Sequence, residues 1–236
     1  MSTASTISAV DVCEHCGRKL ERYSFEVLGK KVTFLDTCDC AGATAERDPM
    51  RYNRDTEQSR RESRYERAGI GSMYRTADAS CHDYVRAVES GRNVYIHGPN
   101  GSGKSMLAAS IAKKLCDAYV DVLFVNACHA VKTLQAAMDG KETDIYERMC
   151  SVPVLVIDDI GKGNPTEWDA STWYSVMEAR YAEALPTVVT TNYSGSELIV
   201  RLTAKGDDST AKAILSRLRG GAVVVKLDGT DRRVAS

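Results

Sequence analysis

The sequence predicts an α/β fold with a parallel, doubly wound sheet, and three observations favour it. Short apolar runs alternate with helical stretches from Gly69 onward. One run leads into a glycine-rich loop that is followed by a helical stretch, and another run ends in two adjacent aspartates. Strands that alternate with helices are typical of parallel sheets, which bind ligands beyond the carboxyl ends of their strands.

The expected elements follow from these runs. Strands are expected at residues 93–98, 120–127, 152–160, 186–192 and 222–227. Helices are expected at residues 104–119, 129–140, 165–184 and 211–221. Each apolar run has the length of a buried strand, and each helical stretch is long enough to cross back over a sheet.

The third expected helix has its own start signal and its own apolar stripe. Asn164 is the expected cap, Pro165 fits the first helical position, and Glu167 completes a pattern like a capping box. A stripe at helical spacing is expected to face the core, and it consists of Ala170, Trp173, Met177 and Tyr181.

Composition sets the class of protein. The chain has 236 residues, of which 43% are hydrophobic and 27% charged, with a net charge of −1. Nucleic-acid contacts would therefore have to come from local patches. No apolar run approaches the roughly 18 residues that span a bilayer, and the N-terminus resembles no secretory signal. A cytoplasmic protein without a membrane partner is expected, so its eight cysteines are expected to be reduced.

The glycine-rich loop, "GPNGSGKS" at residues 98–105, has the Walker A pattern between an expected strand and an expected helix. Its glycines let backbone N–H groups face phosphate oxygens. Lys104 can reach the β- and γ-phosphates, and the Ser105 hydroxyl can ligate Mg²⁺. The expected ATP-binding residues are Gly98, Pro99, Asn100, Gly101, Ser102, Gly103, Lys104, Ser105 and Met106.

The two aspartates in "VLVIDDIG" complete this site. Asp158 lies at the end of its expected strand and matches the Walker B carboxylate that holds Mg²⁺. Asp159 is the expected catalytic carboxylate that orients the attacking water. The alternative is that Asp159 only shapes the outer shell of the metal.

Two further residues are catalytic candidates alongside Lys104 and Asp159. Asn192 closes "TTN" and would lie near the γ-phosphate if its strand runs between the Walker A and Walker B strands; otherwise it is a strand-end residue. Arg217, in "ILSRLRGG", could reach a neighbouring subunit's nucleotide as an arginine finger. Its alternative role is a surface ion pair.

Four cysteines near the N-terminus predict a structural zinc site. Cys13 and Cys16 form C-x₂-C, and Cys38 and Cys40 form C-x-C after 21 further residues. Four thiolates suit tetrahedral Zn²⁺, and a module too small for a core needs such a staple. Reduced cysteines in a loose segment are the alternative. His15 is more readily a neighbour than a ligand. The isolated thiols are expected in the core, and they are Cys81, Cys116, Cys128 and Cys150.

The domain organisation expected from these motifs has three parts. Residues 1–45 form the zinc-binding module, and residues 69–236 form the P-loop ATPase domain. Between them, residues 46–68 form a charged linker or solvated helix, because this stretch is polar and arginine-rich.

The Walker motifs, together with "LPTVVTTN" and "ILSRL", resemble the DnaC/DnaI-type replicative helicase loaders and the IstB-type transposition ATPases of the AAA+ class. The resemblance covers roughly residues 69–236. It implies an ATPase that self-assembles through its ATP sites, grips single-stranded DNA and places a hexameric DnaB-type helicase, which the N-terminal module contacts. It also implies adenine contacts at Ile70 and Tyr74, and a nucleotide-sensing basic residue at Arg233. Only nine residues follow the last expected strand, so no full C-terminal lid is expected.

Candidate DNA contacts are weaker. Lys132 and Lys141 could face a central channel. Between residues 201 and 233, eight Lys/Arg oppose four Asp, which suits a phosphate-binding face, although solvated surface charge is the default.

The function predicted from the sequence is ATP-dependent helicase loading with ATP, Mg²⁺ and structural Zn²⁺ as cofactors. An IstB-like transposition helper and a nucleotide-gated adaptor that does not turn over ATP appreciably remain alternatives. A P-loop kinase is disfavoured, because "IDDIG" and "TTN" fit water-directed chemistry better.

Overall fold

The computed structural model describes residues 12–27, 30–35, 37–46, 49–138, 144–203 and 207–229. The chain divides into two compact units, Met1–Arg60 and Arg61–Ser236, which are described separately below. No helix in the described ranges is long and apolar enough to cross a membrane.

The second unit is built on a five-stranded parallel sheet with the order β4-β5-β6-β3-β7. Its strands are β3 (Val94–His97), β4 (Val122–Asn126), β5 (Val154–Asp158), β6 (Thr187–Thr191) and β7 (Val223–Lys226). Each strand lies within one of the five runs predicted from the sequence, so the predicted fold class is confirmed. The strands that carry the predicted Walker motifs, β3 and β5, both flank β6.

Continuous apolar runs form the central strands because both faces of the sheet are covered. All five residues of β5 and of β6 are buried. Side chains alternate between the two faces: Val94 and Ile96 of β3 belong to one core cluster, and Tyr95 belongs to the other. The sheet therefore separates two cores.

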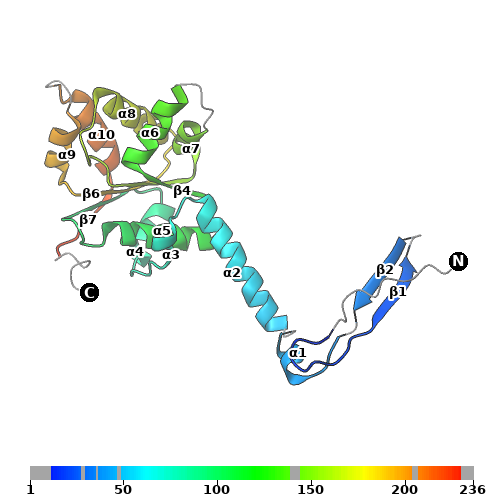
Figure 1. The fold of residues 1–236 in the computed structure, drawn as a ribbon. Helices are drawn as coiled ribbons and strands as arrows, with labels where there is room; N and C mark the ends of the chain where they lie inside the picture. The colour runs from blue at the N-terminus through cyan, green and yellow to red at the C-terminus, as the bar shows by residue number, and fades with distance from the viewer. Residues whose placement is uncertain are drawn as a thin grey trace. The chain divides into compact units, whose positions relative to one another are not determined.

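Helices cover both faces of this sheet, and Figure 1 shows the two layers. One layer contains α3 (Ser72–Arg75), α4 (His82–Glu89) and α5 (Lys104–Asp117). The other contains α6 (Ala127–Met138), α7 (Ile145–Ser151), α8 (Glu167–Ala182), α9 (Gly195–Leu202) and α10 (Ser209–Arg219). The parallel strands and their crossover helices bring the ends of β3, β5 and β6 to one edge of the sheet.

The start of α8 differs from the sequence prediction. The N-cap is Thr166, not Asn164. The Thr166 hydroxyl accepts from the Asp169 amide at 3.3 Å, and the Asp169 carboxylate accepts from the Thr166 amide at 2.8 Å. This reciprocal pair is a complete capping box, so Pro165 precedes the helix and does not open it.

The apolar stripe of α8 is also corrected at one position. Ala170, Trp173 and Met177 are buried, but Tyr181 is 67% exposed. The buried place is taken by Arg180, which is 1% exposed. Its guanidinium donates to the carbonyls of Met149, Val152 and Pro186, so backbone acceptors compensate the burial of the charge.

The first unit contains elements that the sequence motifs did not indicate. The strands β1 (Arg22–Val27) and β2 (Lys30–Leu35) pair antiparallel, and α1 (Ala41–Glu46) follows. The helix α2 (Pro49–Arg67) occupies the stretch predicted as a linker or solvated helix, and its residues from Arg61 onward belong to the second unit. The three-part domain division stays a prediction.

Candidate nucleotide site and cysteine cluster

The loop between β3 and α5 has the backbone that phosphate binding requires. A Cβ atom at Gly98 would overlap the carbonyl oxygen of Leu227, so only glycine allows this close approach to the end of β7. Gly103 has a φ of 93° and caps α5, which begins at Lys104. The loop therefore presents backbone N–H groups and a helix N-terminus at the carboxyl edge of the sheet.

Lys104 lies inside this loop. Its ammonium group donates to the carbonyl oxygens of Gly98 at 2.9 Å and Pro99 at 2.7 Å, and the residue is buried. These two carbonyl oxygens compensate the charge of the Lys104 ammonium group, as phosphate oxygens could do when a nucleotide is bound. The predicted ATP-binding residues from Gly98 to Met106 are contiguous, and Met106 is exposed on the first turn of α5.

Asp158 and Ser105 lie together, as predicted. The Ser105 hydroxyl donates to Asp158 Oδ1 at 2.7 Å. Burial raises the pKa of the Asp158 carboxyl, while hydrogen bonds from Thr190 and Ser105 oppose that rise. A buried carboxylate beside a hydroxyl is a donor set of hard oxygens, which fits a Mg²⁺ ion held between this edge and a bound nucleotide.

The chain turns away from β5 at Asp159, whose backbone is left-handed with a φ of 61°. Its amide donates to Thr190 Oγ1 at 2.9 Å. Its carboxylate accepts from the Lys162 ammonium at 2.7 Å, and this pairing raises the pKa of Lys162. The predicted catalytic carboxylate is thus adjacent to Asp158 and carries an ion pair of its own.

Asn192 directly follows β6, which runs between β3 and β5 as the prediction for its role requires. Its side-chain Oδ1 is buried and accepts no hydrogen bond from the described residues. An amide with an unsatisfied buried oxygen at this edge can accept from a water or, in the flipped orientation, donate to a phosphate.

Arg217 is engaged within its own chain. It forms an ion pair with Glu178 of α8, and it donates to the Ala213 carbonyl at 3.1 Å. Its guanidinium lies 5.1 Å from the centre of the Tyr174 ring. The structure therefore contains the surface ion pair that the sequence analysis gave as the alternative role of Arg217. This pair lies on the face formed by α8 and α10.

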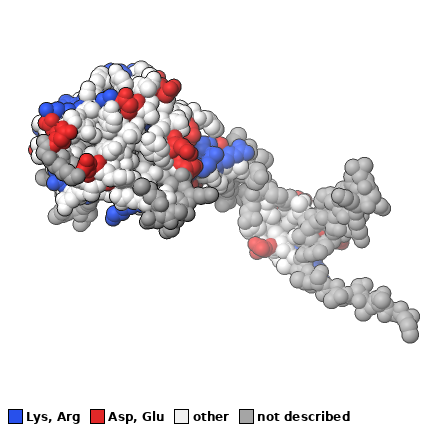
Figure 2. Space-filling view, turned by 90° about the horizontal axis from the view of Figure 1, so that it is seen from above, with Lys and Arg blue, Asp and Glu red and all other residues white. Residues whose placement is uncertain are grey.

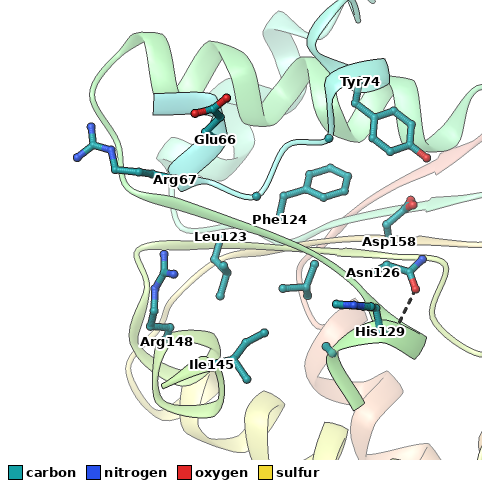
Figure 3. A pocket seen from close by; sticks show the side chains of 14 residues that line it. Glu66, Arg67, Tyr74, Leu123, Phe124, Asn126, His129, Ile145, Arg148 and Asp158 are labelled. Carbon is teal, nitrogen blue, oxygen red and sulfur yellow. Dashed lines mark hydrogen bonds between the residues drawn. The ribbon is translucent and has the colours of Figure 1, made fainter. Parts of the chain in front are cut away.

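A pocket of about 540 Å³ lies beside the edge strand β4, and Figure 3 shows its lining. Phe124 and Tyr74 are close, with ring centres 5.9 Å apart, and Asp158 reaches the pocket from β5. Tyr74, a predicted adenine contact, lines this pocket, which includes no residue of the loop at 98–105. Ile70, the other candidate, is 1% exposed within the core and offers no surface to a base.

The four N-terminal cysteines converge. Their Sγ atoms all lie within 4.8 Å of one another, with Cys13 to Cys40 at 3.7 Å and Cys16 to Cys38 at 3.4 Å. A tetrahedral site with Zn–S bonds of about 2.3 Å places its sulfurs about 3.8 Å apart, so the cluster fits zinc. Backbone N–H groups of Cys16 and His15 lower the pKa of Cys13 to about 6, which favours the thiolate that binds metal.

The segments around the cluster explain its geometry. Gly17, with a φ of 70°, turns the chain after Cys16, and Cys40 lies directly before α1. A Cβ at Gly42 would overlap the His15 ring, so the histidine packs beside α1. His15 is outside the ligand group, as expected of a neighbour.

Only part of the candidate DNA-contacting set falls within the described residues. Lys141 and Arg233 lie outside the described residues. Lys132 is exposed on α6. On the face of the second unit turned to the viewer in Figure 2, basic and acidic side chains are interspersed among the residues drawn in colour.

Two site residues were missed by the sequence reasoning. Thr190 contacts both aspartates, and Lys162 pairs with Asp159. The two threonines before Asn192 were a sequence signal for Thr190, because a hydroxyl near a strand end can donate a hydrogen bond to a buried carboxylate on the neighbouring strand. Lys162 lies three residues after Asp159, and nothing in the sequence distinguishes it from other surface lysines.

Fold and site together define a P-loop ATPase fold of the AAA+ class. The family model for IstB-like ATP binding proteins matches residues 76–236, and the chain belongs to this family. It is similar to the replicative helicase loader DnaI of Bacillus subtilis, with 29% identity over 149 residues, which are 61% of this chain and 48% of that protein.

It is also similar to the putative ATP-binding protein of insertion sequence IS21 from Pseudomonas aeruginosa, with 28% identity over 62% of this chain and 54% of that protein. The chain thus spans about half the length of these curated relatives. The crystal structure of DnaI superposes with a TM-score of 0.53 and 26% identity, over 67% of this chain and 87% of that one.

Proposed function

We propose that the protein hydrolyses ATP at the edge of the sheet formed by β3, β5 and β6. The observation that carries this proposal is the convergence of Ser105, Asp158 and Asp159 beside the loop at 98–105. Lys104 exchanges its carbonyl partners for the β- and γ-phosphates. Ser105 and Asp158 hold the Mg²⁺ that neutralises phosphate charge when a nucleotide is bound.

In this proposal Asp159 orients the water that attacks the γ-phosphate, and Asn192 contacts the same phosphate or that water. Asp159 first has to exchange its bond to Lys162 for the water. Because the Lys162 side chain is 57% exposed, water can solvate its ammonium group once the ion pair is broken, at little cost in free energy.

Arg217 is proposed to complete the ATP site of a neighbouring subunit. Its ion pair with Glu178 lies on the surface, so a neighbour that docks on α8 and α10 can offer phosphate in exchange for the carboxylate. Hydrolysis then requires self-assembly.

The proposed biological role is ATP-dependent loading of a hexameric DnaB-type replicative helicase onto single-stranded DNA, with the cysteine module contacting the helicase. The similarity to DnaI supports it, as does the cysteine cluster ahead of the ATPase unit. The family also contains insertion-sequence proteins, so a transposition helper is the second candidate.

Loading is tested with the replicative helicase of the source cell and a circular single-stranded DNA that has no ends. A helicase ring can enter such a circle only if it is opened. The protein is expected to increase the helicase recovered on the circle in the presence of ATP, whereas Lys104→Ala protein is not. Failure to increase recovery, together with binding to a transposase encoded beside the protein, would support the transposition helper.

A nucleotide-gated adaptor is the third candidate, favoured by the ion pair that occupies Asp159. It predicts partner binding that depends on ATP but no phosphate release. Measurement of phosphate release with both DNA and helicase present separates it from the proposed ATPase.

A further inference from the structure

One buried hydroxyl contacts both aspartates of the site. Thr190 lies on β6 beside β5 and is 0% exposed. Its Oγ1 donates to Asp158 Oδ1 at 2.6 Å and accepts from the Asp159 amide at 2.9 Å. Its carbonyl oxygen accepts from the Ile160 amide at 3.0 Å. Thr190 therefore bonds to three consecutive residues, the last residue of β5 and the first two of the turn that follows it.

The hydrogen bond from the Asp159 amide to Thr190 stabilises an unusual backbone conformation at Asp159. A residue other than glycine rarely adopts a φ near 61°, and such a conformation persists only where its surroundings hold it. The Thr190 hydroxyl gives the amide of this turn a partner at the point where the chain leaves the sheet. The conformation in turn sets the direction of the Asp159 carboxylate.

The bond to Asp158 fixes the plane of its carboxyl group. Ser105 donates to the same Oδ1 atom, but the oxygen of Ser105 is also the proposed Mg²⁺ ligand. Thr190 is fully buried behind the carboxylate and is the donor that remains dedicated to it. Hydrogen bonds of this kind orient ligand carboxylates, and their loss typically costs about 10- to 100-fold in metal affinity or activity.

We propose that Thr190 is a positioning residue that sets both carboxylates of the ATP site, Asp158 for Mg²⁺ and Asp159 for water. Two effects follow from one hydroxyl. Its loss weakens the coupling between Mg²⁺ and nucleotide binding, and it lowers turnover. Only the turnover effect rests on the proposed ATP hydrolysis.

The chain offers a matched control in the next residue. Thr191 is also 0% exposed, and its Oγ1 donates to the Ile160 carbonyl at 2.8 Å. The same hydroxyl accepts from the Tyr193 amide at 3.3 Å, and neither of its partners is an aspartate carboxylate. Thr191→Val therefore removes a buried hydroxyl from the same strand end, at a similar cost to the fold, without touching the proposed function of Thr190.

The test uses the full chain and compares Thr190→Val, Thr190→Ser and Thr191→Val with the unchanged protein. Affinity for a fluorescent ATP analogue is measured with Mg²⁺ and with a chelator, and kcat and KM are measured separately. Thr190→Val is expected to reduce the gain in affinity from Mg²⁺ by about tenfold and to lower kcat by at least as much. Thr190→Ser is expected to restore both, and Thr191→Val to leave the Mg²⁺ gain unchanged.

Equal Mg²⁺ gains in Thr190→Val and the unchanged protein would overturn the proposal, as would equal losses in Thr190→Val and Thr191→Val. If Thr190→Val does not fold, as judged by thermal unfolding, Thr190→Ala removes the same hydroxyl with a smaller side chain and takes its place. If the unchanged protein releases no phosphate, the proposed hydrolysis fails, while the Mg²⁺ gain still decides the role of Thr190.

Discussion

Asp158 and Asp159 are neighbours in sequence but differ in environment. Asp158 is 3% exposed and accepts two hydroxyl hydrogen bonds, whereas Asp159 turns outward and pairs with Lys162. A buried carboxylate with fixed donors suits a metal ligand, and a more accessible one suits contact with water. The change of backbone conformation between them produces this division.

Asp159→Asn is therefore expected to keep Mg²⁺-dependent ATP binding and to lower turnover by at least about 10²-fold, the typical effect of losing a positioned acid–base group. Phosphate release and nucleotide affinity are measured on the same preparation, with Lys104→Ala as the control that loses productive binding. Normal turnover in Asp159→Asn protein would leave Asp159 with a role in the outer shell of the metal only.

At the scale of elements, the last turns of α2 are fixed to the end of α5 by one carboxylate. Asp117 accepts from Arg61 at 2.7 Å and from the Tyr65 hydroxyl at 2.8 Å. Burial raises the pKa of Asp117, but these hydrogen bonds outweigh it, and the net pKa is lowered. The bonded carboxylate stabilises the fold in its ionised form.

The pH dependence of stability follows from this direction. The pKa of Asp117 in the folded protein lies below its unfolded value of about 3.9. The contribution of the ionised carboxylate to the free energy of unfolding is therefore fully present above about pH 3.9, and it is lost as the pH falls through the folded pKa. Asp117→Asn is expected to cost about 1–2 kcal/mol at pH 7, measured by urea unfolding, and this difference should shrink below about pH 4. Asp121→Asn, at an exposed position nearby, is the control. A difference that stays constant down to pH 3 would contradict the assignment.

At the scale of the whole molecule, the cysteine cluster and the ATP site belong to different compact units. The purified protein is expected to contain one Zn²⁺ per chain by elemental analysis. Cys38→Ser should lower that content, while Cys128→Ser, whose hydroxyl can keep the bond to the Lys162 carbonyl, should not. Removal of the zinc by a chelator, followed by restoration of Mg²⁺ in excess, is expected to leave ATP affinity unchanged. Protein purified under reducing conditions without chelator yet free of zinc would refute the metal site.

Assembly provides the second prediction at this scale. ATPase rate per subunit is expected to rise with protein concentration and with single-stranded DNA, because Arg217 is proposed to act on a neighbour's nucleotide. Arg217→Ala should remove that rise with nearly unchanged nucleotide affinity. Arg219→Ala should retain it, because the Arg219 guanidinium lies 5.5 Å from the centre of its own Tyr95 ring.

Mixing Arg217→Ala with Lys104→Ala protein sharpens this experiment. Each variant supplies what the other lacks, so mixed assemblies should regain some activity. No recovery at any ratio, with assembly confirmed by light scattering, would show that Arg217 does not act between subunits.

The sequence by itself determined the five parallel strands, the Walker motifs and the cysteine spacing. Its apolar runs match the strands because both faces of the sheet are buried, and its glycines mark positions that the backbone restricts. These are local signals, since strand burial and loop conformation leave a pattern in consecutive residues.

Only the tertiary structure decided what these elements contact. The burial of Arg180, the exposure of Tyr181 and the contact of Thr190 with two aspartates depend on residues distant in sequence. The partner of Arg217 is Glu178 for the same reason. A hydroxyl or a guanidinium has the same local pattern whether it faces solvent or a neighbouring strand, and packing between elements decides which partner it meets.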